Sequence, residues 1–196
     1  PVLTGLGGTP IASAISNGPA AAVFDPDKMG SVQPVLGYPV NNSLAHQYGY
    51  TPTSKNPHWN MTSEVRGVVF PNNTSSVLFF GRHGVGDYCY GTGGTTGQCY
   101  DLAGSGKGEH AFPYVYQVWA YNANDLVAVK QGTKQPDAIK PYATWTFTLP
   151  YQGENRDNKI AGAAYDPATG RIYLSQWCAY AECEPVVHVL KIGTSG

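Results

Sequence analysis

The chain has 196 residues, a formal net charge of -1 and only 13% charged residues, while Gly (24), Pro (15) and Tyr (14) are abundant. This composition favours one all-β domain with many short strands and tight turns over a helical bundle. Because the sequence has no basic cluster and no apolar run of about 18 residues, we expect neither nucleic-acid binding nor a membrane span.

The N-terminal region predicts a partial repeat. Residues 20–33, AAAVFDPDKMGSVQ, have the same pattern of apolar positions as VWAYNANDLVAVK at 118–130, with Phe24 matching Tyr121. We therefore expect the two segments to occupy equivalent places in repeated β units. The first ten residues, PVLTGLGGTP, have neither a basic start nor a long apolar stretch, so we expect an exported chain to be in its processed form.

A gapless internal repeat organises the rest of the chain. VRGVVFPNNTSSVLFFG (65–81) aligns with IAGAAYDPATGRIYLSQ (160–176), and Gly67 falls on Gly162. Each copy is typical of a strand, a short turn and a second strand. The turns PNNTS and DPATG contain the Pro, Asn and Gly residues that favour tight turns. The repeat predicts two β-hairpins of the same construction.

Further strands flank the hairpins. VYQVWAY (115–121) and VVHVLKI (186–192) show period-2 alternation and are rich in β-branched and aromatic residues. In YATWTFTLP (142–150), threonines alternate with larger apolar residues such as Trp145 and Phe147. We expect this last segment to precede the second hairpin as the first strand of its unit.

The repeated unit is strand, strand, turn, strand, strand, which is typical of a β-propeller blade. We predict an all-β fold that forms a β-propeller portion of about two and a half four-stranded antiparallel blades. The partial blade covers residues 9–31, the large blade 35–127 with a Gly-rich, disulfide-bridged insertion at 84–112, and the compact blade 138–193. A β-sandwich with accidental self-similarity is the alternative.

Such a portion does not close a ring, because propellers usually need about four to eight blades. An open stack would leave edge strands exposed, which is an aggregation hazard. We therefore expect either that this sequence is part of a longer chain, or that the missing blades come from another chain or from copies of itself.

The insertion at 84–112 joins two neighbouring strands, and loops of this length are usually functional or disordered. His83, Asp87, Glu109 and His110 flank it, and two imidazoles with two carboxylates suit a divalent metal or acid–base chemistry. The sequence has no H-E-x-x-H or G-x-S-x-G motif. A structural role for these side chains is the alternative. We expect no cofactor, unless these four residues bind a divalent metal.

Aromatic residues in and near the insertion suit the recognition of sugars or proteins, because rings on loops give a large contact area at low entropy cost. The alternative is that they pack over the edge of the blade as a small core. The candidate ligand-binding residues are Arg82, His83, Tyr88, Tyr90, Tyr100 and Trp59.

The four cysteines fall into two close pairs. Several connectivities are open, but proximity in the sequence favours Cys89–Cys99 and Cys178–Cys183. Two short disulfides indicate an oxidising compartment, and we therefore expect an extracellular, periplasmic or cell-surface location. Four reduced thiols in a cytosolic protein are the alternative.

Three long stretches carry a family resemblance: VRGVVFPNNTSSVLFFGRHGVGDYCYG, GEHAFPYVYQVWAYNANDLVAVKQGTKQP and AGAAYDPATGRIYLSQ. Together with ISNGPAAAVFDPDKMG, they resemble the C-terminal part of an uncharacterised family of exported, mostly bacterial, β-propeller-like proteins. The chains of that family extend further toward the N-terminus, which implies that this sequence corresponds to a C-terminal portion. The insertion is shorter here, although its cysteines and its Arg-His start match. The resemblance supports the fold and implies no catalytic residues.

These features predict an extracellular binding or structural/assembly protein that contacts a glycan, a surface polymer or partner subunits. Its propeller surface and its Cys-bridged, Tyr/Gly-rich loop would make those contacts. The alternative is a hydrolase or lactonase of the propeller type, with metal or acid–base residues at the channel mouth. A propeller hosts both functions, but the candidate groups here cluster on an insertion, which favours binding. Self-assembly through open sheet edges is a third hypothesis.

Overall fold

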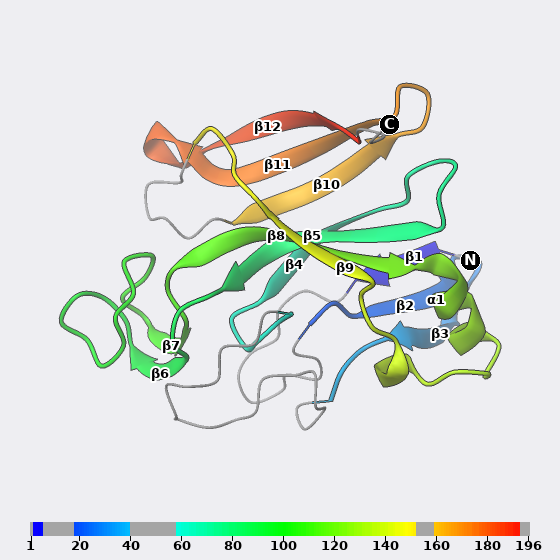
Figure 1. The fold of residues 1–196 in the computed structure, drawn as a ribbon, viewed down its shortest axis with the longest axis horizontal. Coiled ribbons are helices and arrows are strands. Elements are labelled where there is room, and N and C mark those ends of the chain that lie inside the picture. Colours follow the sequence, from blue (N-terminus) through cyan, green and yellow to red (C-terminus); the bar gives the residue numbers. More distant parts are fainter. Residues whose placement is uncertain (1, 6–17, 40–57, 152–158, 193–196) are drawn as a thin grey trace.

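The computed structural model describes residues 2–5, 18–39, 58–151 and 159–192. Strands dominate this part of the chain, and they form three antiparallel sheets and a short two-stranded ribbon (Figure 1). The prediction of an all-β fold is confirmed. The start of the partial blade predicted at 9–31 and the segment 40–57 of the large blade lie outside the described residues.

Each sheet follows the chain as a meander. The N-terminal sheet has the order β1-β2-β3, from Val2–Gly5, Ala21–Asp25 and Lys28–Leu36. The central sheet has the order β4-β5-β8-β9, from Glu64–Val69, Ser76–Gly84, Tyr114–Asn122 and Ala143–Phe147. The C-terminal sheet has the order β10-β11-β12, from Ile160–Asp166, Arg171–Tyr180 and Glu184–Lys191. The ribbon pairs β6 with β7, from Cys89–Thr92 and Lys107–His110.

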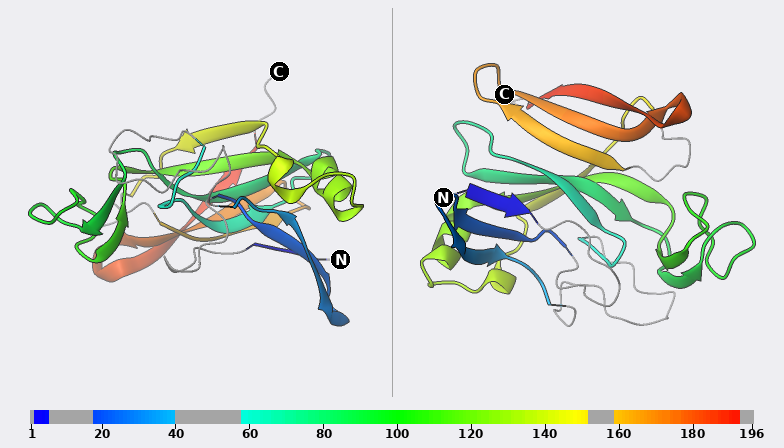
Figure 2. Two further views of the ribbon diagram at one scale, coloured as in Figure 1. Left: turned by 90° about the horizontal axis from the view of Figure 1, so that it is seen from below. Right: turned by 180° about the vertical axis from the view of Figure 1, so that it is seen from behind.

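The three sheets lie side by side with the central sheet in the middle, as two opposite views agree (Figures 1 and 2). Strand β10 packs along β4, and β1 also contacts β4, so the first strands of the three sheets are neighbours. The approach of β10 to β4 requires a residue without a side chain, because a Cβ at Gly67 would lie 2.5 Å from the Cβ of Ala163.

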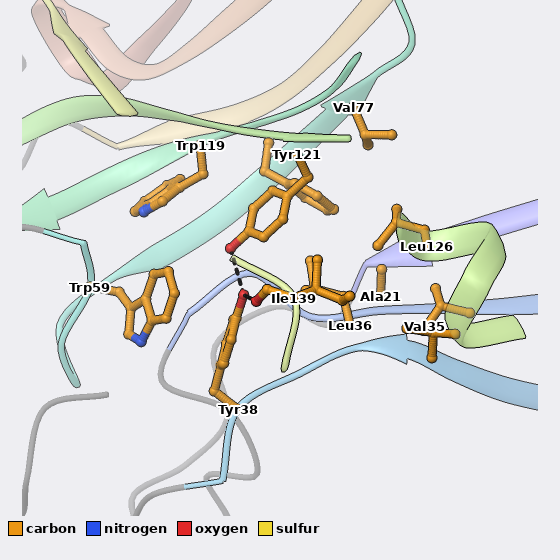
Figure 3. Close-up of a cluster of buried hydrophobic side chains, with 12 residues drawn as sticks. Ala21, Val35, Leu36, Tyr38, Trp59, Val77, Trp119, Tyr121, Leu126 and Ile139 are labelled. Carbon is orange, nitrogen blue, oxygen red and sulfur yellow. Dashed lines mark hydrogen bonds between the residues drawn. The ribbon is translucent and has the colours of Figure 1, made fainter. Parts of the chain in front are cut away.

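A first hydrophobic cluster fills the space between the N-terminal and central sheets (Figure 3). Tyr38 stacks on Trp59 with ring centroids 4.3 Å apart. The Tyr38 hydroxyl lies 3.0 Å from that of Tyr121 and donates to the carbonyl oxygen of Ile139 at 2.5 Å. This polar pair is therefore satisfied inside an apolar core. The other buried members are Ala21, Val35, Leu36, Val77, Phe79, Trp119, Leu126 and Val129.

A second hydrophobic cluster joins the central sheet to the C-terminal sheet. Leu78 and Phe80 of β5 meet Ile172 and Leu174 of β11 in this cluster, and all four side chains are buried. Because each sheet packs on its neighbour through apolar side chains, the stack is held mainly by hydrophobic burial.

The two predicted hairpins are confirmed, and they share one register. In β4–β5, Val68 pairs with Phe79, and in β10–β11 Ala163 pairs with Leu174, which are equivalent positions of the repeat. Each first strand also has a register shift immediately before the glycine of the repeat. A β-bulge bends a strand and increases its twist, so the two hairpins are bent at the same place.

The match between the N-terminal segment and residues 118–130 is wrong in part. The N-terminal segment forms the β2–β3 hairpin, whereas β8 ends and a helix, α1 (Ala123–Lys130), follows. The side chain of Asn122 accepts a hydrogen bond from the backbone two residues later and so caps the helix. Leu126 and Val129 are the buried residues of α1, and a spacing of three residues is that of a helix face rather than of a strand.

The place predicted for the strand within 142–150 is also wrong. It forms β9 (Ala143–Phe147), but β9 pairs with β8 at the edge of the central sheet and not with β10. A period-2 pattern specifies a strand without naming its neighbour. The unit predicted at 138–193 therefore contributes three described strands to its own sheet, and one to the central sheet.

Candidate functional site

The predicted insertion is an ordered ribbon that projects from the ends of β5 and β8, away from the sheets (Figures 1 and 2). The backbone N–H groups of Val85 and Gly86 donate to the carbonyl oxygens of Pro113 and Ala111, each at 2.9 Å, and so continue the pairing of the two strands. The approach of the backbones is close there, because a Cβ at Gly86 would lie 1.8 Å from the oxygen of Phe112. The two flanks therefore meet, as the sequence predicts.

Both predicted disulfides are present. Cys89 at the start of β6 is bonded to Cys99, with Cα atoms 5.7 Å apart, and this bond closes the ribbon on itself. The second bond joins Cys178 to Cys183 at the turn between β11 and β12. No cysteine is free.

A buried carboxylate, Asp101, is the polar centre of the ribbon, and it is only 3% exposed. Its Oδ2 lies 2.6 Å from Nδ1 of His110 and accepts a hydrogen bond from the hydroxyl of Tyr114 at 2.7 Å. Its Oδ1 accepts from the backbone N–H of Ala103 at 2.7 Å. The three donors come from the tip, the second strand and the base of the ribbon. We call this set the Asp101 latch.

The sequence prediction missed Asp101. The residue lies nine positions before His110 and thirteen before Tyr114, and only the pairing of the ribbon strands brings the three together. The one local sign is its turn-forming hydrogen bond to a backbone N–H two residues later, which is common for aspartate in any loop.

An Asp–His pair suits acid–base catalysis only when the second ring nitrogen faces a reacting group. Here Nε2 of His110 faces the carbonyl oxygens of Gly91 and Gly106 at 3.2 and 3.1 Å. Both ring nitrogens of His110 therefore face acceptor oxygens within the ribbon. This arrangement holds the ribbon together and presents no nitrogen to a substrate.

His83 lies at the base of the ribbon and is 2% exposed. Its Nδ1 is 2.9 Å from the hydroxyl of Ser63. The next residue, Gly84, accepts a hydrogen bond through its carbonyl oxygen from the side-chain amide of Asn60 at 2.8 Å. The segment before β4 thus fixes the end of β5.

Arg82 is also engaged within the protein. Its Nη2 lies 2.6 Å from Oε1 of Glu64, and its guanidinium lies over the ring of Tyr114, 4.4 Å from the centroid. The Arg82 side chain is only 12% exposed. Its charge therefore belongs to an internal ion pair and cation–π contact, which connect the central sheet to the Asp101 latch.

Glu109 is a partly buried titratable group on the ribbon. Burial raises the pKa of Glu109 to about 7, and the hydrogen bond that its Oε1 accepts from the Tyr88 hydroxyl, at 3.2 Å, partly opposes this increase. Tyr88 itself is buried. The Tyr88–Glu109 contact packs one side of the ribbon against the other.

The four candidate metal ligands do not form one cluster. In the ranges that the structure describes, no three His, Cys, Asp or Glu side chains are arranged to hold a metal ion. His83 contacts Ser63, Glu109 contacts Tyr88, and His110 contacts Asp101. These three of the four candidate donors, His83, Glu109 and His110, therefore have separate partners within the protein, and Asp87 belongs to no such cluster of the described residues.

The aromatic candidates separate into buried and exposed residues. Trp59, predicted to lie exposed on a loop, is fully buried in the first hydrophobic cluster (Figure 3), and Tyr88 is also buried. Tyr90 is half-buried on β6. Tyr100 is 63% exposed, and its ring meets the edge of Phe112 at a centroid distance of 5.9 Å. Tyr100 is therefore the most exposed of the predicted aromatic residues that the structure describes.

Two further exposed aromatic pairs lie outside the ribbon. Tyr142 and Trp145, beside and on β9, are 57% and 48% exposed, with ring centroids 6.5 Å apart. Tyr151 and Tyr180 meet near the second disulfide at 5.8 Å. The first pair lies at β9, the edge strand of the central sheet, and the second lies at the end of β11, whereas Tyr100 lies on the ribbon.

None of the helices in the described ranges is long and apolar enough to cross a membrane. Comparison of the chain with family models, with curated proteins and with solved structures finds no match. Arguments about function therefore depend on the residues themselves.

Proposed function

We propose that the chain is a sector of a β-propeller-like stack that acts outside the cell as a binding module. Three observations support the sector: the meander order of each sheet, the shared register of the two hairpins, and the neighbouring first strands β1, β4 and β10. Propeller blades have this order, and their first strands surround a common axis.

The observation that carries the binding function is the construction of the ribbon. It projects from the sheets, is closed by the Cys89–Cys99 bond, and is filled by the Asp101 latch, yet it leaves the ring of Tyr100 exposed. A rigid loop that presents an aromatic ring loses little entropy when it binds. We propose a glycan as the ligand, because an exposed ring suits the apolar face of a sugar.

The two disulfides support a location outside the cytosol, because such bonds persist in oxidising compartments. The alternative, a propeller hydrolase, has one observation in its favour among the described residues, the pKa of Glu109 raised to about 7, but that carboxyl accepts a hydrogen bond from buried Tyr88. The buried His110–Asp101 pair faces backbone oxygens, and the other candidate acid–base groups are engaged separately.

The binding proposal is tested on an array of bacterial and plant polysaccharides. We expect the chain to bind at least one polysaccharide, and Tyr100→Ala to weaken that binding about tenfold, which corresponds to about 1.4 kcal/mol for one stacked ring. Tyr142→Ala is the matched control, since Tyr142 is also an exposed tyrosine, at 57% against 63% for Tyr100, but lies beside β9. No binding to any polysaccharide, or equal loss in both variants, would refute the proposed role of the ribbon.

A further inference from the structure

The central sheet packs against a neighbouring sheet on each of its two faces. One of its faces, with Val69, Leu78 and Phe80, packs against Ile172 and Leu174 of the C-terminal sheet. At this interface, the face of the central sheet that carries Leu78 and Phe80 meets the face of the C-terminal sheet that corresponds, in the repeat, to the opposite one.

The opposite face of the central sheet makes the preceding interface. Val77 and Phe79 pack against Ala21 and Leu36 of the N-terminal sheet. In the repeat, Val77 and Phe79 correspond to Ile172 and Leu174. The same face of the repeated hairpin is thus used at both interfaces, always toward the preceding sheet.

The repeat then identifies an uncovered face on the C-terminal sheet. Tyr173 and Ser175 occupy the positions of Leu78 and Phe80, which are buried by a following sheet. No further sheet follows the C-terminal sheet in the part of the chain described, and Tyr173 and Ser175 are only partly buried.

This face is apolar across its strands. Tyr173 pairs with Val189, and Ser175 pairs with Val187. Val187 is 59% exposed, Val189 is 56% exposed, and Trp177, two residues beyond Ser175, is 51% exposed. We call this surface the trailing face. Exposed contiguous apolar surface of this kind is typical of an interaction site.

The N-terminal sheet has a corresponding face at the other end of the stack. Val23 packs toward the central sheet, so Ala22, which is buried, and Phe24, which is partly buried, point the opposite way. Pro34 pairs with Ala22, and Val32, two residues earlier on β3, is 56% exposed. We call this second apolar surface the leading face.

We propose that the trailing face of one copy of this chain binds the leading face of a second copy, and that two copies close into one ring. This inference rests on the proposed propeller sector. Two copies supply six sheets, because the described residues of each copy form three, and closed propellers have about four to eight blades. The new interface repeats the one that the chain already makes twice, so no other partner is needed to cover either face.

The charges at the turns favour this arrangement. Within the chain, the turns of successive sheets touch, because the side chain of Asn72 donates to the carbonyl oxygen of Pro167 at 3.1 Å. In the proposed dimer, the C-terminal sheet of one copy would be followed by the N-terminal sheet of the second copy. An equivalent contact between turns would place the turn before Arg171 beside the β2–β3 turn of the second copy, which contains Asp25 and Asp27. An exposed arginine would then face two carboxylates, which favours this orientation.

The experiment is sedimentation velocity and native mass spectrometry of the 196-residue chain over a range of concentrations. We expect a mass of twice 20.9 kDa. Val189→Lys and Val32→Lys, one on each face, should each weaken the dimer about a hundredfold, because a charged amine would be buried in an apolar interface. Val127→Lys is the matched control, since Val127 is 49% exposed on α1 and lies outside both faces. Circular dichroism checks that each variant is folded.

Each outcome decides the proposal. A folded wild-type monomer at all concentrations, or assemblies larger than two copies, would overturn the closed pair. An effect of Val189→Lys without an effect of Val32→Lys would overturn the head-to-tail arrangement in favour of two trailing faces in contact. Glycan binding is measured on the same samples. If a monomeric chain still binds glycan, only the proposal of the dimer is refuted. If Tyr100→Ala leaves glycan binding unchanged in a dimeric chain, only the proposed function of the ribbon is refuted.

Discussion

Replacing Asp101 with alanine should open the ribbon while leaving the sheets folded. The substitution removes the acceptor of three hydrogen bonds, from His110 and Tyr114 side chains and from the Ala103 backbone. His110 and Tyr114 are buried, and each buried donor left without an acceptor costs about 1–3 kcal/mol. We therefore expect a loss of about 3–5 kcal/mol in the local stability of the ribbon.

Hydrogen exchange measures this loss directly. The amide of Gly94 donates to the carbonyl oxygen of Asp101, and the amide of Cys99 donates to that of Thr92, so both report on ribbon opening. Their protection should fall at least about a hundredfold, since each 1.4 kcal/mol is a factor of ten. Amides of β11 should be unaffected, because β6 and β7 make their extensive contacts with each other.

The matched control is Asp125→Ala on α1. Asp125 forms an ion pair with Lys134, and both side chains are substantially exposed, so its removal should cost less than about 1 kcal/mol. If the ribbon amides in Asp101→Ala kept their wild-type protection, the Asp101 latch would not hold the ribbon. If β11 lost protection equally, the ribbon would not open independently.

Three further predictions concern stability. The pKa of Glu109 is raised to about 7 in the folded chain. Between about pH 4.5 and pH 7 the folded state therefore keeps a proton on Glu109 that the unfolded state has released. The free energy of unfolding is highest below about pH 4.5 and falls as the pH rises through 7. We expect a loss of about 1 kcal/mol after allowance for the partial exposure of the carboxyl, and Glu109→Gln should remove this pH dependence in urea titrations. Gly67→Ala should destabilise the chain by about 1–3 kcal/mol in the same assay, because the new Cβ would lie 2.5 Å from that of Ala163; an unchanged midpoint would contradict the close approach of β4 and β10. Trp59→Ala should cost about 3–5 kcal/mol by loss of core packing, whereas the exposed Tyr100→Ala should cost less than about 0.5 kcal/mol; equal costs would contradict the burial of Trp59.

The features that could be predicted from the sequence are local. The hairpins of the repeat depend on turn residues and on alternation within a few positions, and both are visible in DPATG and its neighbours. The disulfides join cysteines ten and five residues apart, so proximity is a sufficient guide. For the same reason the meeting of the ribbon flanks follows from the pairing of the adjacent strands β5 and β8.

The features that the sequence did not reveal depend on contacts between distant residues. The alternating pattern of β9 specifies a strand but not the strand that it pairs with. That strand is β8, because the chain turns back through α1 after β8 and returns beside it. Trp59 lies among polar residues in NPHWN, and its burial depends on Tyr38, which follows β3 and lies 21 residues earlier in the chain. The role of Asp101 requires the ribbon to be folded before its partners meet.

The tip of the ribbon, beyond the Cys89–Cys99 bond, is a site where the chain can accept insertions. This tip is exposed, and an added Cβ at Gly104 or Gly106 would meet no atom within 4 Å. A peptide inserted between Gly104 and Ser105 would lengthen a loop whose ends, Asp101 and Gly106, are held together by backbone hydrogen bonds to Gly94 and Gly93, so the insertion costs little entropy. New segments can therefore be displayed at this point, by natural variation or by engineering, on a scaffold whose core does not have to be repacked.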